Sequence, residues 1–132
     1  MNTNKHHRLD YCAAKKVVMA FSNKKAASVI NGRYNTDGKI LYLGIIPVAR
    51  WNDDGTLAIK SGTNNTNIEY MLREYVNMVL RVFYPVKNPP RLVKRCREIW
   101  MLFADKAEAC THRGYEWFTF TDKEEFFIPE FC

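Results

Sequence analysis

Several features that mark common classes of protein are missing from this sequence. The longest apolar stretches, such as Leu43 to Ala49, span only a few residues, whereas a helix that crosses a bilayer needs about 20. Residues 2–8 are polar, so the N-terminus lacks the apolar segment of a secretion signal. We therefore expect a cytoplasmic protein that does not enter a membrane, with residues 1–8 forming a flexible tail.

Motifs of catalysis and metal binding are also missing. The chain has no Gly-x-x-x-x-Gly-Lys phosphate loop and no Gly-x-Ser-x-Gly nucleophile turn. Its four cysteines, Cys12, Cys96, Cys110 and Cys132, include no Cys-x-x-Cys pair, and a structural zinc site normally uses closely spaced ligand pairs. Cys110 and His112 are two residues apart, a spacing that does not bring a thiol and an imidazole together. We predict a protein that is not an enzyme, with no metal, no cofactor and reduced cysteines.

Two adjacent carboxylate pairs leave one catalytic alternative open. Asp53-Asp54 precedes Gly55, as expected of a tight turn, and Glu124-Glu125 fits the exposed tip of a hairpin. Such pairs also occur in small metal-dependent nucleases and hydrolases, in which changing Asp53 or Asp54 would abolish turnover.

The chain has the size and composition of one folded domain. It contains 132 residues, of which 47% are hydrophobic and 14% aromatic, and this is too apolar for a disordered chain. No internal repeat is present. We predict a single domain over residues 1–132.

Apolar residues at helical spacing alternate with runs rich in β-branched and aromatic residues. We expect, in chain order, a helix from Leu9 to about Phe21, a polar loop from Ser22 to Gly38, strands at Lys39–Leu43, Ile46–Trp51 and Thr56–Ser61, a helix from Ile68 to Tyr84, a second helix from Arg91 to about Ala109, and a closing hairpin formed by Tyr115–Thr121 and Glu125–Pro129. The predicted fold is α+β, with a small antiparallel sheet, made of a meander and a C-terminal hairpin, packed against an N-terminal helix and a helix pair.

Alternation along the strands predicts which side chains face the core. The expected core face carries Leu41, Leu43, Leu57 and Ile59, and the opposite face carries Tyr42, Arg50 and Lys60. Thr66 or Asn67 is expected to cap the helix that begins at Ile68.

Charge is distributed unevenly along the chain. Residues 1–80 carry 11 basic and 6 acidic side chains, residues 81–97 carry 6 basic and none acidic, and residues 98–132 carry 3 basic and 8 acidic. Acid-free basic segments are typical of surfaces that neutralise phosphates.

This segment supplies our predicted binding surface for nucleic acid, on the helix pair. Its proposed members are Arg73, Arg81, Lys87, Arg91, Lys94, Arg95 and Arg97, with Tyr70 and Tyr84 available to stack on bases. Arg73, Asn77 and Arg81 follow one another at a spacing of four, which predicts a polar ridge on the first helix.

Other interpretations remain open. The basic side chains can simply solvate a helix, bind an acidic protein, or be neutralised by the acidic C-terminal third. The aromatic tail offers a surface for a protein partner or a homodimer, or packs in the core; its members are Trp117, Phe118, Phe120, Phe126, Phe127 and Phe131.

The middle of the chain resembles a module found in small bacteriophage accessory proteins, most of them uncharacterised. The resemblance covers roughly residues 9–83 and rests on Leu41-Tyr42-Leu43, the run Ile46–Trp51, the turn Asp53-Asp54-Gly55, the strand Thr56–Ile59, and the connection from Gly62 to Thr66. The chain departs from that pattern at Gly44-Ile45, where a His-Gly turn is common, and at Thr63, where a Trp is common. The resemblance implies an origin in a phage or mobile element and brings no catalytic residues. It fits a protein that engages nucleic acid or a host nucleoprotein complex, for example as an anti-CRISPR-like inhibitor of host defence.

Overall fold

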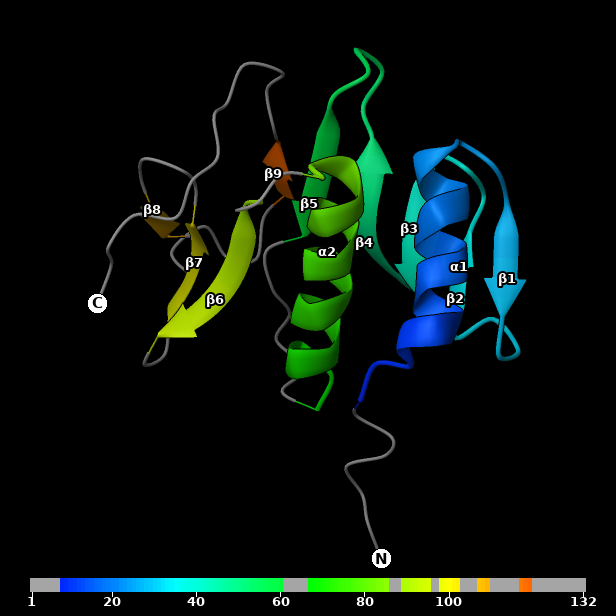
Figure 1. Ribbon diagram of the computed structural model, residues 1–132, viewed down its shortest axis with the longest axis horizontal. Helices are drawn as coiled ribbons and strands as arrows, with labels where there is room; N and C mark the ends of the chain where they lie inside the picture. Colours follow the sequence, from blue (N-terminus) through cyan, green and yellow to red (C-terminus); the bar gives the residue numbers. More distant parts are fainter. Residues whose placement is uncertain are drawn as a thin grey trace, which may run out of the picture.

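Two helices cover one face of an antiparallel β-sheet (Figure 1). The computed structural model describes residues 8–60, 67–85, 89–95, 98–102, 107–109 and 117–119. Its elements are α1 (Tyr11–Ser22), β1 (Ala27–Val29), β2 (Tyr34–Thr36), β3 (Ile40–Leu43), β4 (Ile46–Trp51), β5 (Leu57–Lys60), α2 (Glu69–Phe83), β6 (Arg91–Arg95), β7 (Glu98–Leu102), β8 (Ala107–Ala109) and β9 (Trp117–Thr119). One sheet has the order β1-β2-β3-β4-β5-β9, and a second sheet, β6-β7-β8, lies beside α2 (Figure 1).

The first helix forms where the sequence predicts it. Asp10 is the N-cap, and its carboxylate accepts a hydrogen bond from the Ala13 amide at 3.1 Å, which satisfies one of the amide groups left free in the first turn. Ala14, Val17, Val18 and Phe21 form its buried face.

The predicted three-stranded meander is confirmed as β3, β4 and β5. Leu41, Leu43, Leu57 and Ile59 are buried, whereas Tyr42, Arg50 and Lys60 are half-buried. The turn at Asp53-Asp54-Gly55 joins β4 to β5, and the Asn52 amide donates to the Thr56 carbonyl at 2.8 Å. Gly55 has a φ of +87°, a conformation that glycine adopts without steric cost.

The segment Ser22–Gly38, predicted as a loop, instead contains the strands β1 and β2. Both are only three residues long, too short to give a clear alternation of apolar residues. Asn31-Gly32 belongs to the tight turn that joins them, with positive φ at Ile30, Asn31 and Gly32. The buried anchor of this hairpin is Tyr34, whereas Ile30 is exposed.

The helix predicted from Ile68 to Tyr84 is confirmed as α2. The N-cap residue is Ile68, one position after the predicted Asn67; the other predicted cap, Thr66, lies outside the described residues. Glu69 occupies the first turn, where a negative charge is favourable to the helix dipole.

The prediction of a second helix, from Arg91 to about Ala109, is wrong. This segment forms β6, β7 and β8, and Leu92 pairs with Met101 and Lys94 with Ile99 across β6 and β7. The side chains alternate, with Arg91 exposed, Leu92 buried and Lys94 exposed. The spacing of seven between Leu92 and Ile99 fits a helix, but Val93, Ile99 and Trp100 favour a strand. The backbone groups of β6 find partners in β7, so the extended form is satisfied.

The predicted closing hairpin is present in part among the described residues. β9 falls within Tyr115–Thr121 and pairs with β5, Lys60 opposite Trp117. The predicted partner strand, Glu125–Pro129, lies outside the described residues.

One apolar core joins the helices to both sheets. Phe21, Trp51 and Phe83 stack on one another with ring centroids 4.9 to 5.7 Å apart, and the Trp51 Nε1 donates to the Phe21 carbonyl at 3.0 Å. Leu92, Ile99 and Met101 extend the same core into the second sheet. The α+β single-domain prediction is therefore confirmed. Among the described residues, no helix combines the length and apolar character needed to cross a membrane.

Candidate nucleic-acid interface

Glu69 forms ion pairs with two members of the predicted basic surface. Its Oε1 lies 2.7 Å from the Lys94 Nζ and 3.3 Å from an Arg73 guanidinium nitrogen. The hydrogen bond from Lys94, with help from Arg73, lowers the pKa of the Glu69 carboxyl. The side chains of Arg73 and Glu69 are only 16% and 18% exposed. The Lys94–Glu69 pair therefore joins β6 to α2, the Arg73–Glu69 pair lies within α2, and neither cation is unpaired.

Asn77, the middle of the predicted polar ridge, also serves the fold. Its Nδ2 donates to the Leu92 carbonyl at 3.0 Å, and its Oδ1 accepts from the Leu92 amide at 2.7 Å. One side chain thus satisfies both backbone groups of a residue on the edge of β6. Of the ridge, Arg81 is left as the exposed member that makes no ion pair with any described residue.

Arg81 instead lines a groove between α1 and α2. The groove has a volume of about 350 Å³ and is lined by Tyr11, Lys15, Met78, Arg81 and Val82. Lys15 is also exposed and without an ion pair among the described residues. Sequence reasoning missed the α1 members of this groove, although Lys15-Lys16 on the polar side of a predicted helix was a visible signal.

Tyr11 is held in place at this groove. Its side chain is 50% exposed, and its hydroxyl donates a hydrogen bond to a Glu74 carboxylate oxygen. That hydrogen bond is the main reason why the pKa of the Tyr11 phenol is raised. The ring is therefore fixed by its hydroxyl while much of its surface stays in water.

The other predicted binding residues are scattered. Arg91 is exposed on β6, and Arg95 ends that strand opposite Glu98. Tyr70 is 55% exposed and carries the Arg73 guanidinium 5.7 Å from its ring centroid, whereas Tyr84 is half-buried against the core. Lys87 and Arg97 lie outside the described residues.

The positive charge gathers on the helical side of the molecule. The described residues of the two helices, their flanks and β6 (8–25, 67–85 and 89–95) contain ten basic and three acidic residues. The meander, residues 26–60, contains four basic and three acidic residues. A nearly neutral sheet thus lies against a strongly basic helical layer.

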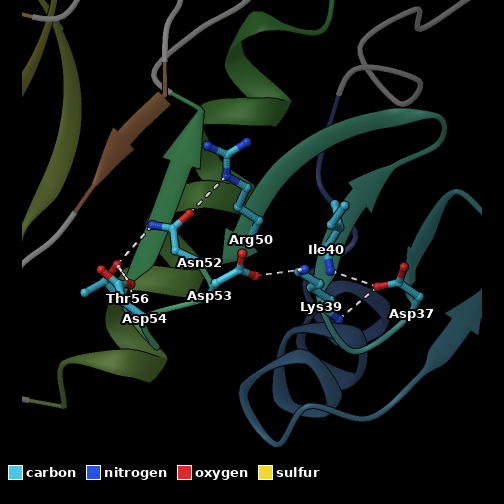
Figure 2. Close-up of polar contacts among 8 residues, drawn as sticks. All are labelled: Asp37, Lys39, Ile40, Arg50, Asn52, Asp53, Asp54 and Thr56. Atoms are coloured by element: carbon cyan, nitrogen blue, oxygen red, sulfur yellow. Dashed lines mark hydrogen bonds and ion pairs between the residues drawn. The ribbon is translucent and has the colours of Figure 1, made fainter.

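Of the two carboxylate pairs, Asp53-Asp54 lies in the turn between β4 and β5 (Figure 2), and Glu124-Glu125 lies outside the described residues. Asp54 accepts from the hydroxyl and amide of Thr56 at 2.6 and 3.0 Å, and these hydrogen bonds lower its pKa. Asp53, 98% exposed, lies 3.3 Å from the Lys39 ammonium. Asp37 accepts from the amides of Ile40 and Lys39, each at 2.8 Å, which lowers its pKa as well. No group of three potential metal ligands occurs within the described part of the chain.

Arg50, a basic residue of β4, is held in place on the sheet by its neighbours. The Arg50 Nε donates to the Asn52 Oδ1 at 3.2 Å, and Asn52 in turn donates to the Thr56 hydroxyl at 3.0 Å (Figure 2). The Arg50 guanidinium also lies 4.4 Å from the Trp117 ring centroid, a cation–π contact between residues 67 positions apart in sequence. Trp117 is half-buried; the side chains of the other aromatic residues of the tail lie outside the described residues.

A wider depression lies over β1 and β2. Its volume is about 620 Å³, and the described residues of its lining include Asp37 and no basic residue. It therefore lacks the charge that a polyanion requires.

Comparisons with known proteins return no relative: no family model, no curated protein and no solved structure matches this chain. The resemblance to bacteriophage accessory proteins stays a hypothesis, and the function has to be argued from the residues themselves.

Proposed function

We propose that this protein is a non-catalytic nucleic-acid-binding protein that contacts phosphates with the exposed cations of its helical side. The proposed contact residues are Lys15, Lys16, Arg81 and Arg91. The observation that carries the proposal is the excess of ten basic over three acidic residues on that side, next to a meander that is almost neutral.

The four proposed contact residues differ from Arg73 and Lys94 in having no ion-pair partner among the described residues. All four are exposed, and none makes an ion pair with another described residue. An unpaired cation can release the counterions of a phosphate without first breaking an internal contact. The basic surface of this proposal is therefore α1, the last turn of α2 and the start of β6.

The order of contacts along α2 supports including Arg91. Lys94 lies beside Glu69 in the first turn, and Leu92 lies beside Asn77 farther along. β6 thus runs antiparallel to α2, and Arg91 lies toward the end of the helix that carries Arg81 (Figure 1).

The biological setting belongs to the same proposal. A phage or mobile-element protein acting in the cytoplasm of a host cell would meet nucleic acid either free or within a host nucleoprotein complex. Inhibition of a defence complex by occupying its nucleic-acid path, as an anti-CRISPR-like protein would do, is one way in which such binding acts. The support for this setting is the sequence resemblance, which is associational.

The experiment is a salt titration of binding to a labelled 20-base-pair duplex, followed by fluorescence anisotropy. We expect the logarithm of the association constant to fall linearly with the logarithm of salt concentration. In the double variant Lys15→Gln/Arg81→Gln, the slope should become shallower by about 1.8, since each phosphate contact contributes about 0.9.

The matched control is Arg33→Gln/Lys39→Gln, which removes two exposed cations from the meander. It should leave the slope almost unchanged. Absence of binding at low salt, or an equal loss in both double variants, contradicts the proposed function.

A further inference from the structure

We propose that the groove between α1 and α2 holds one unstacked base of a single-stranded nucleic acid. In this arrangement the base lies against the Tyr11 ring, and its flanking phosphates contact Lys15 and Arg81. The inference rests on the proposed nucleic-acid binding and deepens it by naming the form of nucleic acid and the residue that selects it.

The groove lies between two helices that run side by side. Tyr11 contacts Glu74, and Phe21 stacks on Phe83 at 5.7 Å, so α1 and α2 run in the same direction (Figure 1). Between these two contacts, Lys15 of α1 and Met78 and Val82 of α2 line a groove with a volume of about 350 Å³. Ligand sites in proteins have volumes of this order.

The lining of the groove is suited to an aromatic ring. Met78 and Val82 supply apolar contact, and the methionine sulfur is polarisable and favours aromatic partners. The exposed face of Tyr11 adds a stacking surface of the kind that binds bases regardless of their identity. Because the Tyr11 hydroxyl is already bonded to Glu74, little side-chain freedom remains to be lost on binding.

Charge sets the orientation of the bound strand. Glu74 accepts the hydrogen bond of the Tyr11 hydroxyl, and a carboxylate at that point repels a phosphate. Lys15 and Arg81, which line the groove, attract one. The base therefore enters the groove, and the phosphates on either side of it stay with the two cations.

This arrangement distinguishes a single strand from a duplex. In a duplex the faces of the bases are covered by their neighbours, so Tyr11 and Met78 have nothing to stack on. A single strand can turn one base out at low cost. Lys15 and Arg81 then contact the phosphates of a duplex or of a single strand, whereas Tyr11 stacks only on a base of a single strand.

The test measures the affinities of a labelled ten-nucleotide single strand and of the matching duplex, again by anisotropy. We expect Tyr11→Ala to weaken single-strand binding roughly 5- to 100-fold, the range found when one stacked base loses its aromatic partner, and to leave duplex binding unchanged. Tyr11→Phe keeps the ring and should stay within about threefold of the natural protein.

The control is Tyr42→Ala. Tyr42 is a half-buried tyrosine of β3 that does not line the groove, so its removal should change neither affinity. Thermal unfolding of each variant confirms that the fold is intact. Single-strand binding that survives Tyr11→Ala, or an equal loss with Tyr42→Ala, overturns the inference.

A base with its phosphate can come from a nucleic-acid strand or from a free nucleotide, and competition with a nucleoside monophosphate distinguishes the two. It should displace the ten-nucleotide strand only at far higher concentration than an unlabelled strand, because it offers one phosphate instead of several. Displacement at equal concentration would assign the groove to free nucleotides and overturn the strand proposal. Loss of all nucleic-acid binding at low salt contradicts the proposed function itself, whereas intact duplex binding with a failed Tyr11 test contradicts only this inference.

Discussion

Glu69 is a carboxylate shared by two cations from different elements. Arg73 follows it by one turn on α2, and Lys94 comes from β6. Only 18% of the Glu69 side chain is exposed, so salt screens its ion pairs less than it screens an ion pair on the surface. Glu69 thus holds a strand to a helix and at the same time engages two cations of the predicted binding surface in ion pairs.

Replacing Glu69 by Gln should lower the free energy of unfolding by about 1 kcal/mol at pH 7. The pKa of Glu69 is lowered in the folded state, so its contribution is present above the unfolded pKa of about 4.3 and is lost as the pH falls through the folded value. The difference between the natural protein and Glu69→Gln should therefore shrink from pH 5 toward pH 2.

Urea denaturation over that pH series measures this difference. Asp53→Asn serves as the control because its ion pair with Lys39 is exposed, and it should cost less than about 0.5 kcal/mol. A constant gap between Glu69→Gln and the natural protein at every pH would contradict the assignment.

At the scale of elements, β6 depends on α2 as well as on β7. Asn77 binds both the amide and the carbonyl of Leu92, at 2.7 and 3.0 Å, while Leu92 itself is buried. An edge strand normally leaves such groups open to water or to another chain. The Asn77 side chain therefore acts as a short substitute for a neighbouring strand.

Asn77→Leu should lower the free energy of unfolding by about 1–3 kcal/mol, because two backbone groups lose their partner in a largely apolar site. Hydrogen exchange at the Leu92 amide should become faster than in the natural protein. Asn77→Asp keeps the oxygen that accepts from this amide and should preserve more of its protection. Unchanged exchange at Leu92 in Asn77→Leu would show that the contact does not fasten β6.

At the scale of the molecule, the core is continuous from α1 to the second sheet. Val17 and Phe21 of α1, Trp51 of β4, and Leu92 and Met101 of the second sheet pack against one cluster. Elements that share a core unfold together in small domains. The β6-β7 hairpin is therefore part of the same cooperative unit as the meander.

Single-tryptophan variants test this unity, since the chain has three tryptophans. Trp100→Phe/Trp117→Phe leaves Trp51 as the reporter of the meander, and Trp51→Phe/Trp117→Phe leaves Trp100 on β7. In each variant, the urea midpoint from fluorescence should equal the midpoint from far-ultraviolet circular dichroism. A lower fluorescence midpoint for Trp100 alone would mean that the hairpin unfolds separately.

The sequence by itself determined the elements whose signals are local. The Asp10 cap with apolar residues at helical spacing determined α1, and the spacing of apolar residues from Ile68 to Tyr84 determined α2. The Asp-Gly turn with alternating strands determined the meander. The same local information also located the excess of positive charge, because composition does not depend on folding.

Only the tertiary structure decided the state of Arg91–Leu102 and the fate of the basic residues. The apolar spacing there suits a helix as well as a hairpin, and the contacts of Asn77 with Leu92 that favour the extended form come from another part of the chain. In the same way, Lys94 is neutralised by a residue 25 positions earlier, and Arg81 meets Lys15 across the helix groove. Pairings between residues distant in sequence have no signature in a single sequence, and they select which cations stay free to bind.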